Sequence, residues 1–137
     1  MKKFITFISK WILPAVILVQ LTGCFTPSKM NQAAWDNDID QIKALIQEGQ
    51  SIEDTAPSPL VAFGVKPLDV AIEKGNYKIV KIFIDSGANI KDIRPMYAET
   101  PQGLFIFNGT PLMLAALKGD LPIVQLLLSA GADIKND

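Results

Sequence analysis

The chain contains an internal repeat, and this repeat restricts its fold more than any other feature of the sequence. Residues 110–134 read TPLMLAALKGDLPIVQLLLSAGADI, and residues 66–90 read KPLDVAIEKGNYKIVKIFIDSGANI. The two segments align without a gap at an offset of 44 residues. A weaker third copy, QAAWDNDIDQIKALIQEGQSI, spans residues 32–52. Such a period is typical of a solenoid, in which neighbouring units bury one another's apolar faces.

Each unit predicts two short helices separated by a glycine. Thr110 is suited to cap the first helix with its hydroxyl, and Pro111 to occupy the first helical position. Gly119 and Gly131 are expected to end the two helices, because a C-terminal cap often requires a left-handed backbone. In the second unit Lys66 replaces the capping Thr, and the first unit lacks the Pro-Leu entry. We therefore expect weaker helix starts in those two units.

The pattern TPLxLAAxxGxxxxVxxLLxxGA, read in residues 110–132, resembles the ankyrin repeat. The resemblance covers nearly all of residues 31–137. It implies an all-α fold, an ankyrin-repeat solenoid of about three helix-turn-helix repeats (about 31–52, 66–90 and 110–134) with two long finger-loop insertions. It also implies a rigid scaffold that binds other proteins. Met113 and Asp69 depart from the family pattern, which usually has His there, and we expect this to weaken a hydrogen-bond network more than the fold.

The two insertions have an unusual composition. The glycine-to-glycine intervals are 38 and 44 residues, against a usual ankyrin period of about 33. The extra residues are EDTAPSPLVAFGV (53–65) and KDIRPMYAETPQGLFIFNG (91–109), and both hold apolar and aromatic side chains, including Leu60 and Val61. In ankyrin stacks these connections project on the concave side, where partners generally bind.

Four aromatic residues of the insertions are predicted partner contacts: Phe63, Tyr97, Phe105 and Phe107. For Phe105 and Phe107 two interpretations remain open, since these rings could instead fold back over the stack as extra core. We assign Tyr97 to the interface, because a tyrosine at a loop tip is a common anchor.

The first helices of the three units supply further candidates. Trp35 aligns with Glu73 and Leu117, so we expect all three on the concave side as partner-binding residues. For Trp35 the alternative is packing against the segment 24–30. Asp36 belongs to a short acidic run that either is solvated near a helix start or meets a basic patch on a partner. In the last helix, apolar side chains either form an interface or are covered by lysines and the polar tail.

The N-terminus predicts export. Three lysines precede the apolar stretch WILPAVILVQ (11–20), which is short for a membrane span of about 20 residues. This arrangement is typical of a secretory signal peptide, here residues 1–23. Leu21-Thr22-Gly23-Cys24 resembles the lipobox of bacterial lipoproteins, which implies that Cys24 receives a diacylglycerol and that residues 24–30 form a lipidated tether. The alternative is a signal anchor, or cleavage elsewhere that leaves a free thiol.

The same resemblance bears on localisation. Phe25, rather than Asp, follows the cysteine. In a Gram-negative lipoprotein this favours the outer membrane, with the protein facing the periplasm. Exposure at the cell surface remains an alternative.

Composition argues against catalysis and against nucleic-acid binding. The chain has no His and one Cys, and it contains neither a GxSxG nor a GxxxxGK[ST] motif. We predict no enzyme, no catalytic residue, no cofactor and no metal site. Residues 24–137 carry 10 of the 13 basic residues and all 14 acidic residues, a side-chain net charge of −4. Nucleic-acid binding would instead call for clustered basic residues.

A lipid-anchored binder implies a protein partner at a membrane. The architecture resembles small lipoprotein immunity proteins paired with phospholipase effectors of type VI secretion. That resemblance implies steric neutralisation of a secreted toxin. The alternatives are a scaffold or adaptor that tethers a resident envelope protein, and a host-facing surface protein. The sequence leaves the identity of the partner open.

Overall fold

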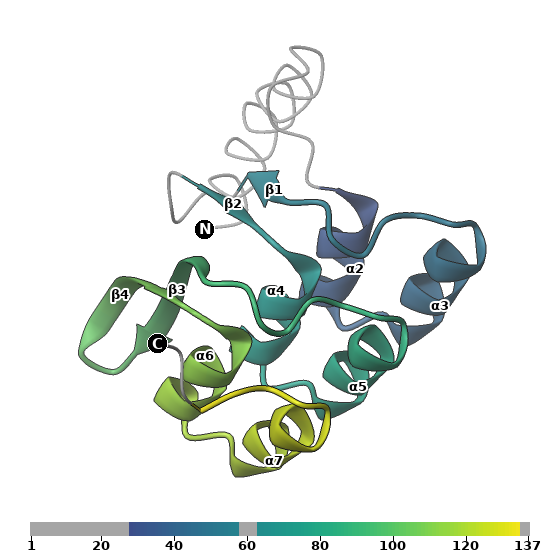
Figure 1. Cartoon of the computed structure of the whole chain (residues 1–137). Coiled ribbons are helices and arrows are strands. Elements are labelled where there is room, and N and C mark those ends of the chain that lie inside the picture. Colours follow the sequence, from purple (N-terminus) through teal and green to yellow (C-terminus); the bar gives the residue numbers. More distant parts are fainter. Residues whose placement is uncertain (1–27, 58–62, 135–137) are drawn as a thin grey trace, which may run out of the picture.

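The computed structural model describes residues 28–57 and 63–134 (Figure 1). The predicted signal peptide (1–23), Cys24, and the insertion residues Leu60 and Val61 lie outside the described residues. The described part contains three helix pairs: α2 (Lys29–Asp36) with α3 (Ile39–Gln47), α4 (Pro67–Glu73) with α5 (Tyr77–Asp85), and α6 (Pro111–Lys118) with α7 (Leu121–Ser129).

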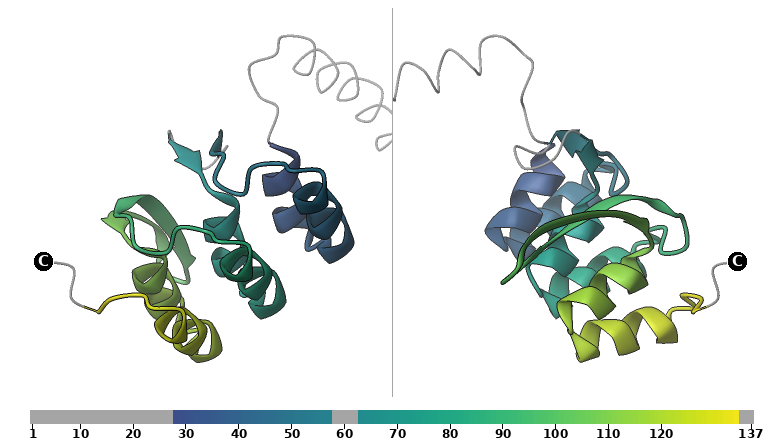
Figure 2. Two further views of the ribbon diagram at one scale, coloured as in Figure 1. Left: turned by 45° about the vertical axis from the view of Figure 1, so that its right-hand side comes forward. Right: turned by 90° about the vertical axis from the view of Figure 1, so that its left-hand side faces the viewer.

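The pairs stack side by side in two rows, as Figure 2 shows. We call α2, α4 and α6 the inner row, because α4 packs on both α2 and α6. We call α3, α5 and α7 the outer row. Each helix pair corresponds to one of the predicted repeats. None of the helices in residues 28–57 and 63–134 is long and apolar enough to cross a membrane.

The helix ends follow the predicted local signals. Thr110 Oγ1 accepts a hydrogen bond from the Met113 amide at 3.4 Å, and Pro111 opens α6. Gly119 closes that helix with a left-handed backbone (φ 70°). Lys66, at the start of α4, makes no capping hydrogen bond with its side chain. The loss of the side-chain cap expected from Lys66 is therefore present in α4, whereas in the first unit Ser28 supplies a side-chain cap to α2.

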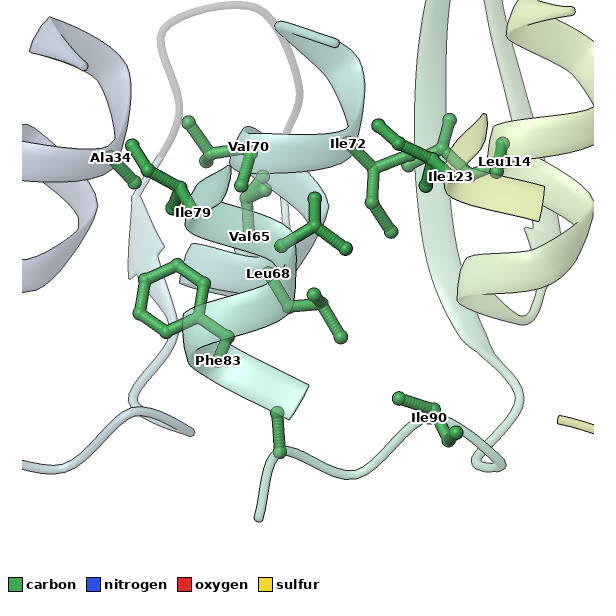
Figure 3. Packing of buried hydrophobic residues seen from close by; sticks show 14 of the residues in the cluster. Ala34, Val65, Leu68, Val70, Ile72, Ile79, Phe83, Ile90, Leu114 and Ile123 are labelled. Atoms are coloured by element: carbon green, nitrogen blue, oxygen red, sulfur yellow. The ribbon is translucent and has the colours of Figure 1, made fainter. Parts of the chain in front are cut away.

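The core runs through all three repeats. Leu45, Phe83 and Leu127 occupy equivalent positions in the outer row, and each is buried. Figure 3 shows the packing around the middle repeat, where Phe83 and Ile79 of α5 lie near Leu68 of α4. Such mutual burial is what makes a stack of short helices stable, because no pair can cover its own apolar face.

The prediction of an all-α fold is wrong for the insertions, which form two small antiparallel sheets. The first pairs β1 (Ala56–Pro57) with β2 (Gly64–Val65), and the second pairs β3 (Arg94–Thr100) with β4 (Gly103–Gly109). In the second sheet Thr100 lies opposite Gly103, so the turn has two residues, Pro101 and Gln102. The finger loop is thus a β-hairpin, because Tyr, Phe, Ile and Thr on both sides of a Pro-Gln-Gly turn favour extended backbone.

The boundary between tether and domain also differs from the prediction. Ser28 caps α2, and Met30 is buried in the core at 2% exposure. Lys29 and Met30 therefore belong to the first helix rather than to a tether over 24–30. The physical reason is that the first repeat, which lacks a Pro-Leu entry, begins with a serine cap instead.

Candidate protein-binding surface

The β3–β4 hairpin packs on the inner row, against α6 and α4. Seen from the side in Figure 2, it crosses in front of these helices. Two carboxylates of α4, Asp69 and Glu73, lie one helical turn apart and therefore face the same way. They hold the two ends of β3.

Asp69 holds the first residue of β3. Arg94 donates from Nε to Asp69 Oδ2 at 3.0 Å and from Nη2 to Asp69 Oδ1 at 2.7 Å, while Nη1 donates to Asp92. Such a bidentate pair fixes orientation as well as distance. Burial raises the pKa of the Asp69 carboxyl, and the Arg94 guanidinium opposes that shift. The pair replaces the interactions of the family's usual His with a contact between repeat and hairpin.

Lys66 extends this pair into a network that also reaches the first insertion. Its Nζ lies 2.8 Å from Glu53 and 3.0 Å from Asp92. Burial lowers the pKa of Lys66, but the hydrogen bonds to Glu53 and Asp92 outweigh it, so that the pKa is raised overall. Glu53 in turn accepts from the Asn89 amide at 2.8 Å. Lys66, which makes no capping hydrogen bond, thus connects the first residues of both insertions through Glu53 and Asp92.

Glu73 holds the far end of β3. Its Oε1 accepts from the Glu99 amide at 2.9 Å and from Lys118 Nζ at 2.8 Å, and Lys118 also donates to the Glu99 carbonyl at 2.8 Å. The Glu73 side chain is only 7% exposed. The predicted partner contact at Glu73 is therefore wrong as a surface position, because its carboxylate is committed to the hairpin.

Tyr97 lies in the middle of β3, opposite Ile106 of β4. It is 4% exposed, so the expectation of a loop-tip anchor is wrong. Burial raises the pKa of Tyr97 to about 12, with further contributions from Glu73, Glu99 and Asp69. The tyrosine therefore packs near the two carboxylates of α4 instead of facing a partner.

β4 carries the exposed apolar side chains of the hairpin. Leu104, Phe105 and Ile106 are 44%, 49% and 62% exposed. For Phe105 and Phe107, the sequence left two interpretations open, an exposed contact or extra core. Phe105 is exposed, whereas Phe107 is partly buried against the core. Phe63, in the first insertion, is also partly buried against the core. Because side chains alternate along a strand, Phe105 lies on one face of the hairpin and Leu104 and Ile106 lie on the other.

The flanking repeats add apolar side chains on the inner row. Met113 and Leu117, one turn apart on α6, are 43% and 48% exposed. Trp35 of α2 is 44% exposed, and Lys74 Nζ lies 3.5 Å from the centre of its ring. Trp35 lies on α2 and Leu117 on α6, and α4 packs between these two helices. We call this set the exposed apolar residues: Trp35, Leu104, Phe105, Ile106, Met113 and Leu117.

Asp36 and its acidic neighbours have local roles. Asp36 ends α2 and accepts from Gln32 at 2.8 Å. Asp38 caps α3 by accepting from the Gln41 amide at 2.9 Å, and Asp40 lies in its first turn. These positions agree with exposed charge near a helix start. A contact between Asp36 and a partner stays a prediction.

Sequence reasoning missed several residues of this surface. Leu104, Ile106 and Met113 are exposed apolar side chains that were not among the predicted partner contacts, and Arg94 anchors the hairpin. Alternating β-forming residues around Pro101 and Gln102 were a signal for the hairpin. No local signal indicates that Arg94 meets Asp69, because they are 25 residues apart.

A model of ankyrin repeats in three copies matches residues 30–137, and the chain belongs to the ankyrin-repeat family. A comparison with curated protein sequences found no match. The repeats indicate a protein–protein interaction module, and members of this family are generally non-enzymatic scaffolds. Within residues 28–57 and 63–134, no group of His, Cys, Asp or Glu side chains is arranged to hold a metal ion.

Proposed function

We propose that the chain is a lipid-anchored protein-binding module of the bacterial envelope, and that it neutralises a secreted toxin such as a type VI phospholipase effector. The observation that supports protein binding most directly is the exposure of Leu104, Phe105 and Ile106 on a hairpin fixed to the repeat stack. Their side chains alternate between the two faces of the hairpin, so β4 presents large apolar side chains on both faces, and such exposed apolar surface often marks an interface. A rigid support lowers the entropy lost on association.

The anchor and the location rest on the N-terminal sequence. Leu21-Thr22-Gly23-Cys24, after a charged and apolar leader, supports lipidation at Cys24, and Phe25 in place of Asp after the cysteine supports an outer-membrane position facing the periplasm. One acyl chain holds a protein only marginally, whereas a lipoprotein carries several. An inhibitor held at the membrane would meet a phospholipase where that enzyme must act. Inhibition would be steric, with the hairpin covering the entrance to the active site.

The lipid is tested on the full chain in its own bacterium. Metabolic labelling with palmitate should mark the natural chain, and Cys24→Ser should remove the label. A labelled Cys24→Ser chain, or an unlabelled natural chain of full length, would contradict the anchor.

The partner is tested by capture on the tagged full chain from cells with active secretion systems. The bound protein is identified by mass spectrometry, and its phospholipase activity is measured with increasing amounts of the chain. Inhibition near a one-to-one ratio supports the immunity function. Capture of a resident envelope protein with unchanged activity would contradict it and favour the scaffold function.

A matched pair of variants tests the surface. Phe105→Glu should weaken inhibition, because it places a charge in the exposed apolar site. Tyr77→Glu is the control, since Tyr77 is a similarly exposed aromatic residue (43% against 49%) on the outer row. Equal loss of inhibition in both variants would contradict binding through the hairpin.

A further inference from the structure

The outer edge of β4 has free backbone groups. Within residues 28–57 and 63–134 the second sheet consists of two strands, so β4 has β3 on one side and no described strand on the other. The Glu99 amide and carbonyl bind Glu73 and Lys118, so they point away from β4. Hydrogen-bonded pairs alternate along an antiparallel ladder. The non-hydrogen-bonded positions of β4 are therefore Leu104, Ile106 and Asn108, which lie opposite Glu99, Tyr97 and Pro95. The N–H and C=O groups of these three residues point outward from the sheet.

The two outer edges of this sheet differ in their hydrogen bonding to the rest of the protein. At Glu99 the outer edge of β3 is occupied by side chains of α4 and α6. Among the described residues, no hydrogen bond beyond the β3 ladder involves Leu104, Ile106 or Asn108. β4 also lacks the charged side chains, proline or bulge that usually protect an edge strand. Such a row of groups is a template on which another extended backbone can pair.

The sequence of β4 indicates which strand fits this edge. It reads Gly-Leu-Phe-Ile-Phe-Asn-Gly (103–109) and is nearly the same in both directions about Ile106. A two-fold contact requires a surface that complements itself. We propose that a second copy of this chain pairs with β4, joining two hairpins into one four-stranded antiparallel sheet centred on Ile106.

The register of this pairing follows from the free groups. With Ile106 opposite Ile106 of the other copy, Leu104 lies opposite Asn108, and all three outward residues pair. This gives about six backbone hydrogen bonds, within the range of about 10 ± 5 found in a typical interface. Phe105 lies opposite Phe107 twice, at a non-hydrogen-bonded position where side chains approach most closely. Because β4 has no charged residue, self-pairing brings no like charges together.

The pairing shares the hairpin with the proposed function, because Leu104, Phe105 and Ile106 are also proposed partner contacts, but neither proposal requires the other. It uses the edge of the hairpin, whereas Trp35, Met113 and Leu117 lie on helices of the inner row. A toxin could bind those residues in a single copy or in the pair.

The test is co-capture of two full-length chains that carry different tags and are made in the same cells. Natural chains should capture each other. Ile106→Lys in both chains should lower capture by about ten-fold, because two lysines then lie directly opposite. Ile106→Lys in one chain and Ile106→Glu in the other should restore it, because opposite charges meet in the same register.

Leu121→Lys in both chains is the control. Leu121 on α7 is 62% exposed, as Ile106 is, but it lies away from the hairpin. The pairing is overturned if natural chains do not capture each other, if Leu121→Lys lowers capture as much as Ile106→Lys, or if the mixed Lys and Glu pair captures no better than the Lys pair. Because Ile106 is exposed, these variants are expected to keep the fold, which circular dichroism of each chain verifies.

Discussion

Arg94 joins two parts of the chain that are 25 residues apart in sequence. Its partner Asp69 is 5% exposed, so that carboxylate depends on the guanidinium for compensation of its lost hydration. The equivalent residue in the last repeat, Met113, is exposed and needs no such partner. At this position an acid costs stability by itself and becomes favourable only with the arginine from the hairpin.

Arg94→Met should lower the free energy of unfolding by about 3–5 kcal/mol, because it leaves a buried carboxylate unpaired. Adding Asp69→Met should recover much of that loss, since the last repeat already uses Met at this position. Urea unfolding of the two variants measures both effects. A double variant no more stable than Arg94→Met would contradict the assigned role of the pair.

The raised pKa of Tyr97 predicts that the protein loses stability at high pH. Its pKa is raised from 10.0 to about 12 in the folded state, so the fold keeps a proton that the unfolded chain releases. The stabilisation of the neutral phenol is fully present below the unfolded pKa and is lost as pH rises through the folded pKa. At about pH 11 the loss amounts to about 1.4 kcal/mol. Tyr97→Phe should reduce the drop in urea midpoint between neutral pH and about pH 11, and an unchanged drop would contradict this.

At the scale of the elements, the hairpin is attached to the stack mainly through side chains. The start of β3 is held by Asp69 and its end by Glu73, so both anchors come from α4. Helix α4 of the middle repeat therefore supports the exposed apolar residues of β4 and has no large exposed apolar side chain of its own. The position of Glu73, whose equivalent Leu117 is exposed in the last repeat, thus supports the neighbouring insertion.

Glu73→Ala should loosen β3 while leaving the repeats folded. It removes one charge-assisted hydrogen bond from the Glu99 amide, worth about 1.5–3 kcal/mol, so that exchange of this amide should accelerate by about 10–100-fold. Glu99→Ala is the control, because the Glu99 backbone makes these contacts. Hydrogen exchange read by NMR distinguishes the two, and equal protection of β3 in both variants would contradict the assigned anchor.

At the scale of the whole molecule, the three repeats form one stack with unequal ends. In the first repeat Gln41 is exposed where Ile79 and Ile123 are buried in the others. In the last repeat, by contrast, Leu121, Leu128 and Ile134 are exposed at 62%, 37% and 76%. At this position the first end of the stack is polar, whereas the last end exposes apolar side chains. Whether a partner covers the last end stays a prediction.

Equivalent core substitutions in different repeats should destabilise different numbers of repeats. Leu45→Ala should cost about 2–5 kcal/mol and Phe83→Ala about 3–5 kcal/mol, since both residues are buried. Because each repeat contacts only its neighbours, Leu45→Ala should mainly expose α2 and α3, whereas Phe83→Ala should expose all three repeats. Hydrogen exchange by mass spectrometry checks this. Equal deprotection of α3 and α7 by Leu45→Ala would contradict it.

The sequence by itself determined the repeats, their helices and their ends, because these depend on local signals: Thr110, Pro111 and Gly119 act within one turn of the chain. It also determined where the insertions fall. The tertiary structure decided the rest: β3 on α4 brings Arg94 to Asp69, commits Glu73 to Glu99, and buries Tyr97 while Ile106 stays exposed. These outcomes depend on contacts between residues that are far apart in sequence. A local sequence pattern does not indicate which of these residues become buried or which of them pair.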